Sequence, residues 1–390
     1  MVSAPLMVLM YDILFVSGSY REALKNRPGY YVALAVTWIP LVALVFLVGT
    51  HGGTVGTGLG MSSVQYAATQ FGVISKYLTL SFWPSPLIVD YESEVARGAA
   101  QIIPYAFIVI SLVIGTAYAI RNVSWLGFLG FWFFAILAPT SSVLPVVSQT
   151  MAEHRMYLPL AAVTALVVIC GESLCHRLLT LFAIPVEDRR FLSRWVPIFI
   201  LAIVAWALLS LTIARNRDYS SELVLWRDTI EKRPTNSRAH SNYGVALIES
   251  GKIDLAFEQF TKALELDPKN ADAVTNIGGI LASQGRGSEA IPFLEDGLRY
   301  RPKNAGAHTN LGSVLAALGR FDEAIEHYRA SLKIDPLHAE THNNLGNALL
   351  RNGKIDDAIS ELRRARELKP DSDQIRLNLQ TALDQKLKSE

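Results

Sequence analysis

The chain has 390 residues, of which 51% are hydrophobic, and a formal net charge of +1. This near-neutral balance lacks the basic surface of a nucleic-acid-binding protein, so no nucleic-acid partner is expected. The averages conceal an apolar half and a charged half that meet near residue 214. Cys170 and Cys175 both fall in an apolar segment, which excludes a disulfide framework and a paired-thiol zinc site.

The first half contains a short opening apolar segment and five longer ones that could each cross a membrane. A helix needs ~20 residues to cross hydrocarbon. The opening segment, Met1 to Ser17, is shorter and resembles the end of a span; no basic segment precedes it and no small-residue cleavage site follows, which excludes a secretory signal. We therefore expect 1–214 to be a polytopic helical membrane domain with about six spans, the first partial. The longer segments are about 30–49, 101–120, 124–146, 157–175 and 195–214.

Positive charge decides whether the apolar segment 66–82, which carries Lys76, also crosses. If this segment does not cross the membrane, eight Lys and Arg residues lie in loops on the same side. If it does cross, the basic residues divide evenly between the two sides. Short cytoplasmic loops carry the excess of Lys and Arg, so 66–82 is interpreted as a re-entrant or interfacial helix on the outer face. The charged half then lies outside the cytoplasm, at a bacterial inner membrane or, in a eukaryote, the endoplasmic reticulum. The eight residues are Arg21, Lys25, Arg27, Arg121, Arg177, Arg189, Arg190 and Arg194.

From Ser237 onward the sequence repeats every 34 residues without insertion. Each repeat has a glycine in its first half, an alanine and a large residue in its second half, and a proline at the turn. This pattern resembles the tetratricopeptide repeat and predicts an α-solenoid of four repeats over 237–370. The recurring residues are Gly244, Gly278, Gly312 and Gly346; Ala256, Ala290, Ala324 and Ala358; Phe260, Leu294, Tyr328 and Leu362; and Pro234, Pro268, Pro302, Pro336 and Pro370.

Both ends of the repeat array have capping signals, and the fold class expected for the whole chain is all-α. Residues 215–236 are interpreted as a linker and a half-repeat capping helix, because Trp226 stands one period before Phe260. Residues 371–390 become highly polar, which predicts a C-terminal capping helix.

An asparagine recurs in every repeat, two residues before the glycine. A side-chain amide carries both a donor and an acceptor, so it can pair with a peptide unit in both directions. A column of amides along a concave surface would hold an extended polypeptide by its backbone, and in this respect the array resembles the asparagine-lined repeats of the O-GlcNAc transferase. The alternative is that each asparagine hydrogen-bonds within its own repeat. The column consists of Asn242, Asn276, Asn310, Asn344 and Asn378.

Three histidines also recur in the array, at a position that a large apolar residue usually fills. We interpret His240, His308 and His342 as helix-packing residues rather than metal ligands, and the sequence predicts no metal site.

Several motifs of the first half, together with the repeats, resemble one enzyme family in their order along the chain. This family comprises the transmembrane-and-tetratricopeptide-repeat O-mannosyltransferases and their bacterial relatives, which have the GT-C membrane glycosyltransferase fold. The resemblance implies transfer of a mannose-like sugar from a polyprenyl-phosphate carrier to protein hydroxyls outside the cytoplasm. The motifs are "PLMVLMYDILF" (5–15), "SKYLTLSFWPSPLIVDY" (75–91), "GFWFFAILAPTSSVLP" (130–145) and "MAEHRMYLP" (151–159).

The last of these motifs brings Glu153, His154 and Arg155 together at the mouth of a predicted span. A lipid-linked sugar presents an anionic phosphate, and Arg offers a planar donor fork that matches phosphate oxygens. Fixed cations also stabilise the charge that develops on the leaving phosphate. We therefore predict a donor-phosphate site of Arg155 and His154, with Lys76 as a further member. Glu153 would orient Arg155 or partly neutralise its charge. The alternative is that these residues only anchor the helix at the interface.

The chain departs from the family pattern at one point, because none of its motifs corresponds to the first outer loop that holds the family's catalytic acid. The expectation is a truncated gene product, a split gene whose partner chain supplies the missing spans, or a relative without catalysis. The catalytic residue is therefore unknown, and no cofactor beyond the lipid-linked sugar donor is indicated. The rival hypothesis is a non-catalytic membrane-anchored scaffold for protein–protein interaction, with a polypeptide partner in the repeat groove.

Overall fold

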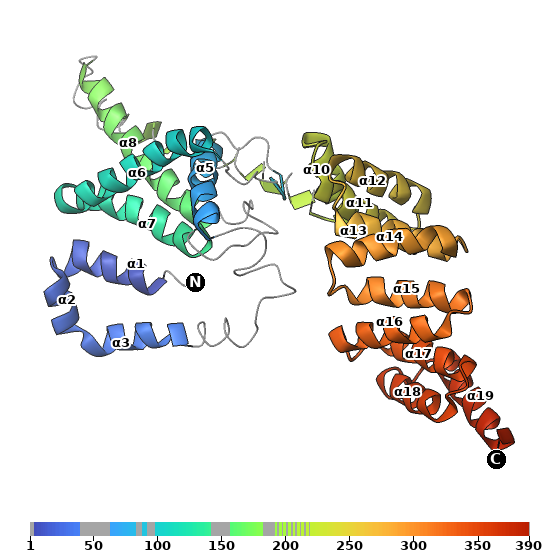
Figure 1. Cartoon of the computed structure of the whole chain (residues 1–390). Coiled ribbons are helices and arrows are strands. Elements are labelled where there is room, and N and C mark those ends of the chain that lie inside the picture. The colour runs from blue at the N-terminus through green and yellow to red at the C-terminus, as the bar shows by residue number, and fades with distance from the viewer. Residues whose placement is uncertain are drawn as a thin grey trace. The chain divides into compact units, whose positions relative to one another are not determined.

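The computed structural model describes residues 4–39, 63–82, 88–91, 98–141, 157–181, a set of single or paired helical residues between 192 and 217, and 219–389. The chain divides into two compact units, Met1–Asp218 and Tyr219–Glu390. Every regular element within the described residues is a helix, which agrees with the predicted all-α fold (Figure 1). The two units are described separately below.

The first unit is built from apolar helices. Among its described residues, α6 is the one helix that is long and apolar enough to cross a membrane, and three shorter apolar helices accompany it: Ala4–Val16, Ser124–Leu137 and Pro159–Leu174. The expected count of about six spans is therefore unconfirmed. The elements are α1 (Ala4–Tyr11), the π-helical turn η1 (Asp12–Val16), α2 (Tyr20–Asn26), α3 (Pro28–Val36), α5 (Ser63–Phe82), α6 (Ala99–Asn122), α7 (Ser124–Ser141) and α8 (Tyr157–Leu181).

Two of these helices overlap predicted segments. The span expected over 30–49 overlaps α3, which ends at Val36. Residues 40–62 lie outside the described part of the chain. The segment predicted as an interfacial helix over 66–82 is helical, as α5, and its position in a membrane stays a prediction.

Small residues and one apolar cluster hold α5, α6, α7 and α8 together. A side chain at Gly127 would collide with the backbone of Ile120, and one at Gly130 would collide with Thr116, so glycine is what lets α7 lie against α6. The buried cluster is formed by Val73, Tyr77, Ile88, Tyr91, Phe133, Leu137, Ala162 and Val163.

A buried carboxylate joins η1 to α3. Asp12 is 3% exposed, and its carboxylate accepts hydrogen bonds from the Tyr31 hydroxyl and, at 2.9 Å, from the Ser17 hydroxyl. The guanidinium of Arg27 lies 3.7 Å from the same carboxylate. An unpaired buried charge would be costly, so these contacts explain how an acidic residue is accommodated in an apolar segment.

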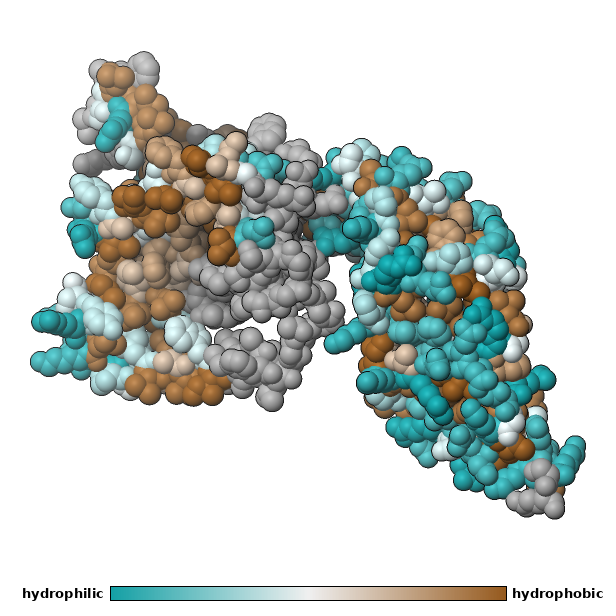
Figure 2. Space-filling view, viewed as in Figure 1, coloured by the Kyte–Doolittle hydropathy of each residue, from teal (hydrophilic) through white to brown (hydrophobic). Residues whose placement is uncertain are grey.

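Much of the described surface of the first unit is apolar. On α6, Phe107, Ile114 and Tyr118 are 74%, 63% and 69% exposed. Figure 2 shows brown surface over much of the described part of this unit, whereas the second unit is mostly teal. Exposed apolar surface of this extent indicates contact with lipid or with another protein.

The second unit is a stack of helical hairpins of 34-residue period. The first and second helices of each repeat pack against each other, and each second helix also contacts the first helix of the next repeat. The first helices are α11 (Ser237–Glu249), α13 (Ala271–Ser283), α15 (Ala305–Ala317) and α17 (Ala339–Arg351). The second helices are α12 (Ile253–Leu266), α14 (Gly287–Tyr300), α16 (Phe321–Ile334) and α18 (Ile355–Leu368), flanked by α10 (Glu222–Lys232) and α19 (Asp373–Ser389).

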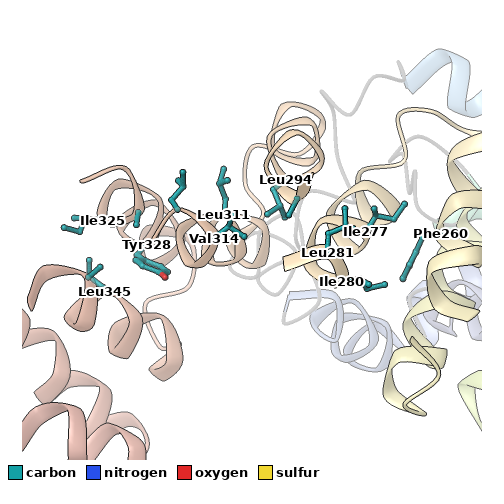
Figure 3. Close-up of a cluster of buried hydrophobic side chains, with 14 of the residues drawn as sticks. Phe260, Ile277, Ile280, Leu281, Leu294, Leu311, Val314, Ile325, Tyr328 and Leu345 are labelled. Atoms are coloured by element: carbon teal, nitrogen blue, oxygen red, sulfur yellow. The ribbon is translucent and has the colours of Figure 1, made fainter. Parts of the chain in front are cut away.

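A continuous apolar core runs through these repeats (Figure 3). Its main contact recurs in every hairpin, between the glycine of the first helix and the large residue of the second. Phe260, Leu294 and Leu362 are fully buried, and Tyr328 is 2% exposed. All members of this core lie within 219–390, so the second unit has a hydrophobic core of its own.

Local signals fix where each hairpin begins and turns. The side chain of Asn236, Asn270 or Asn304 accepts a hydrogen bond from the backbone N–H three residues later and caps the N-terminus of the first helix. In the turn between the two helices, a glycine adopts φ between 74° and 78° in all four repeats, a conformation that other residues seldom adopt.

Helices at both ends complete the array. α10 packs against α11, where Leu223 contacts the core. At the other end, α19 packs against α18 and α17, and Gln380 of α19 stands at the position of the repeat glycine.

Candidate functional site: the asparagine column

The first helices line the inner side of the repeat array. α11 contacts α13, α13 contacts α15, α15 contacts α17, and α17 contacts α19, whereas the second helices, in the part of the array that is described, do not approach one another in this way. The side on which neighbouring repeats lie closer is the concave side of a solenoid, which is the side such proteins use for binding.

The asparagine column follows this inner side from helix to helix. All five side chains are partly buried. A methyl group on Gly279 of α13 would lie 3.2 Å from Asn310 Nδ2 of α15, so Asn310 extends over the preceding first helix. Asn378 of α19 reaches α17 in the same way, where its Nδ2 donates to Asn343 Oδ1 at 2.8 Å. Two members of the column thus reach the preceding first helix, and the exact 34-residue spacing predicts equivalent positions for Asn242, Asn276 and Asn344.

In the first three repeats the column has free hydrogen-bonding capacity, and we call Asn242, Asn276 and Asn310 the open segment. Asn276 Nδ2 donates to the carbonyl of Asp272 in its own helix at 2.9 Å, which leaves its Oδ1 free. Asn242 and Asn310 make no side-chain hydrogen bond within the described residues. A partly exposed amide of this kind can pair with a ligand at no cost in internal hydrogen bonds.

At the C-terminal end the column is closed by its own hydrogen bonds. Gln374 Nε2 donates to Asn378 Oδ1 at 3.0 Å, Asn378 Nδ2 donates to Asn343, and Asn343 Nδ2 lies 3.4 Å from Asn344 Oδ1. These contacts join α17 to α19. We call Asn344 and Asn378 the closed segment. Bonds within one repeat, as in the alternative, are seen for Asn276, Asn344 and Asn378, whereas the bond from Asn378 to Asn343 joins two repeats.

Two pairs of oppositely charged residues lie on or next to the first helices that carry the column. Arg301 binds the carboxylate of Asp272 through both guanidinium nitrogens, one of them at 3.0 Å from Oδ2. Lys369 donates to Glu340 at 2.6 Å, and this hydrogen bond lowers the pKa of Glu340. Both pairs link one repeat to the turn after the same repeat. The column therefore presents neutral amides rather than a net charge, which favours a ligand recognised by its peptide groups.

Most of the predicted donor-phosphate site lies outside the described residues. Glu153, His154 and Arg155 fall outside the described residues, and this site stays a prediction. Lys76 is described: it is exposed on α5, and its Nζ lies 5.4 Å from the ring centroid of Tyr91. This is a cation–π contact between two residues of the same sequence motif.

Sequence reasoning missed the partners that close the column. Asn343 stands next to the column residue Asn344, and Gln374 stands one helical turn before Asn378. An amide at i and another at i+4 on one helix is a recognisable signal. The bond from Asn378 to Asn343, 35 residues away, requires the packing of two helices.

Family models of the tetratricopeptide repeat match this part of the chain. One, described as TPR repeat, matches residues 244–285. Another, described as Tetratricopeptide repeat, matches residues 280–339, 309–373 and 343–383. Among curated proteins, none matches the chain.

Solved structures of repeat proteins are similar to the same half of the chain. YrrB, described as a TPR protein with an unusual peptide-binding site, is 24% identical, with 43% of this chain and 85% of that chain covered and a TM-score of 0.34. MamA from Desulfovibrio magneticus RS-1 is 23% identical, with 39% of this chain and 85% of that chain covered and a TM-score of 0.34. TTC0263 of Thermus thermophilus, a thermophilic TPR protein, is 22% identical, with 45% of this chain and 95% of that chain covered and a TM-score of 0.36. Residues 244–383 of the chain are therefore built from tetratricopeptide repeats.

Proposed function

We propose that this protein is a membrane-anchored binding module whose repeats hold an extended polypeptide by its backbone. The observation that supports the proposal best is the open segment of the column. Three successive first helices carry Asn242 and Asn310, whose amide groups make no internal hydrogen bond within the described residues, and Asn276, whose Oδ1 is unused. Successive repeats thus offer donors and acceptors along one line, which suits an extended chain more than a folded domain.

The chemistry of the open segment predicts what kind of polypeptide binds. Amides pair with peptide N–H and C=O groups, which every residue except proline carries in the same form. Two charged pairs near the column, Arg301 with Asp272 and Lys369 with Glu340, are already satisfied internally and offer little to a charged partner. We therefore expect affinity for unrelated, uncharged, extended sequences, without a strict motif.

The surface of the first unit supports the membrane anchor. α6 has 24 residues with a mean hydropathy of 2.0 over its most apolar window, and most of that window is not buried within the protein. A helix of this length spans about 36 Å at 1.5 Å per residue, enough for a hydrocarbon core of about 30 Å. Lipid would cover the exposed Phe107, Ile114 and Tyr118.

The experiment measures peptide binding by fragment 219–390, which has its own core. Asn242, Asn276 and Asn310 are replaced together by Ala. Each lost pair is worth ~0.5–1.5 kcal/mol, so the affinity should fall by about 10-fold to about 2,000-fold. The melting temperature should change little, because the open segment makes few internal hydrogen bonds.

The closed segment provides the matched control. Replacing Asn344 and Asn378 by Ala breaks the bonds between α17 and α19, which should lower the melting temperature and leave peptide affinity nearly unchanged. Unchanged binding in the open-segment variant, or equal losses in both variants, would refute the proposed role of the groove.

For the first unit we also propose, as a second function, the donor side of a polyprenyl-phosphate-sugar glycosyltransferase, with the repeats recruiting the acceptor polypeptide. Support comes from the motif order in the sequence and from the contact between Lys76 and Tyr91, two residues of one of those motifs. The test is Arg155→Lys, assayed for sugar transfer in membranes containing the full chain and any partner chain. A point charge cannot replace the planar fork, so turnover should fall. Wild-type turnover at equal membrane abundance would exclude Arg155 as a phosphate ligand.

A further inference from the structure

The three recurring histidines share one geometry with different partners. In each, Nε2 faces the carbonyl of a proline six residues earlier, at 3.0 Å for Pro234, 3.3 Å for Pro302 and 3.2 Å for Pro336. In each, Nδ1 faces a side chain of the second helix nineteen residues later. His240 faces Gln259 at 2.8 Å, His342 faces Glu361 at 2.6 Å, and His308 faces a second histidine, His327, at 3.0 Å.

The proline carbonyl fixes the tautomer of His308. A carbonyl oxygen only accepts hydrogen bonds, so the proton must lie on Nε2 when the ring is neutral. The lone pair is then on Nδ1 and, without a metal ion, accepts a hydrogen bond from Nδ1–H of His327 at 3.0 Å, so a bound ion would replace that proton. Metal-binding histidines are held in this way, with one nitrogen on the metal and the other donating to a backbone carbonyl or a carboxylate.

We propose that His308 and His327 bind one divalent transition-metal ion through their two Nδ1 atoms, bridging α15 and α16. Two nitrogens, each ~2.0–2.1 Å from one ion, are roughly 2.9 Å apart at a right angle and roughly 3.3 Å apart at the tetrahedral angle. The observed separation is 3.0 Å. It lies nearer the right angle, which Cu²⁺ and Ni²⁺ adopt in square-planar sites, and Cu²⁺ binds imidazole most tightly of the common divalent ions.

Water would complete the coordination of this ion. In the described part of the chain, no three histidine, cysteine or acidic side chains are grouped as metal ligands. Glu323, one helical turn before His327, is held by Arg320 through hydrogen bonds of 2.6 Å. The site is therefore an open, two-ligand site, and its ion would fix α15, the helix that carries Asn310.

The repeats supply their own control variants. His327→Gln recreates the His–Gln pair of the first repeat, so the hairpin should fold while one of the two ligands is lost. His342→Gln removes a histidine of the same geometry in the next repeat and keeps the proposed site. Both are made in fragment 219–390 without a histidine tag.

The experiment titrates Cu²⁺ into these proteins by calorimetry and records electron paramagnetic resonance spectra. The wild type and His342→Gln should bind one Cu²⁺ with two equatorial imidazole nitrogens and a raised melting temperature. Loss of a second-shell partner alone weakens metal binding by about 10- to 100-fold, so His327→Gln should lose at least about 100-fold in affinity. Equal Cu²⁺ affinity in His327→Gln and wild type, or a wild-type spectrum with fewer than two nitrogens, would overturn the proposal.

Discussion

Gly312 of α15 and Tyr328 of α16 lie so close that a methyl group added to Gly312 would stand 2.8 Å from Tyr328 Cε1. The carbonyl of Ala324 would lie 3.2 Å away on the same side. The same glycine-to-large-residue contact holds the other three hairpins together. Each repeat thus uses the space of a missing side chain to bring its two helices into contact.

Gly312→Ala should therefore destabilise the array. Overpacking of a well-packed core costs ~1–3 kcal/mol, which corresponds to a fall in melting temperature of about 2–12 °C for a unit of this size. Gly306→Ala is the control on the same helix, because a methyl group there meets nothing closer than 3.5 Å. Thermal melting of fragment 219–390 measures both. A Gly312→Ala protein as stable as wild type would show that the helices separate easily.

Two asparagines of the third repeat should respond differently to removal of the side chain. Asn304 caps α15 by accepting a hydrogen bond from the Ala307 N–H at 3.1 Å, whereas Asn310 makes none within the described residues. Asn304→Ala should cost ~1 kcal/mol of stability and leave peptide affinity unchanged. Asn310→Ala should leave the stability unchanged and weaken peptide binding. Melting and peptide titration of the two variants, side by side, check the assignment, and the same response in both would contradict it.

The stability of the metal-free array should fall as the pH is lowered from about 7.5 to about 5.5. The pKa values of His308 and His327 are lowered in the folded protein, so the unfolded chain, with histidine pKa near 6.5, binds more protons in this range. The stability that the neutral pair provides is present above about pH 6.5 and is lost as the pH falls below it.

The second repeat supplies the comparison for this pH effect, because it has Val274 and Phe293 at the equivalent positions. Replacing His308 by Val and His327 by Phe should reduce the acid-induced fall in melting temperature, measured with a chelator present. Equal falls in wild type and variant would assign the effect to other groups.

The sequence was informative wherever one residue type served one local purpose at a fixed period. The 34-residue spacing predicted the hairpins. Each hairpin needs a small residue opposite a large one, as Gly312 lies opposite Tyr328, so the same residue types recur at the same positions. It also predicted that Asn242 to Asn378 form a column. It could not predict that Asn378 would pair with Asn343, or that His308 would face His327, because those contacts depend on how two helices pack.

The first unit was harder to predict for a physical reason. α7 is apolar on all sides, so its sequence has no periodic face that indicates which neighbour it contacts. Its contact with α6 depends on Gly127 and Gly130, whose role becomes visible only next to Ile120 and Thr116. Glu153, His154 and Arg155 remain predictions from the sequence.

The most direct test of backbone recognition changes the backbone of the peptide rather than the protein. A bound peptide is synthesised with single amides replaced by esters, which removes one N–H donor and keeps the side chains. Binding to wild-type fragment 219–390 should weaken by about 2- to 10-fold at the positions that face the open segment, as expected for one hydrogen bond. The same esters should have no further effect on the variant that lacks Asn242, Asn276 and Asn310. Esters that leave wild-type binding unchanged, or that weaken both proteins equally, would contradict recognition of the peptide backbone by the asparagine column.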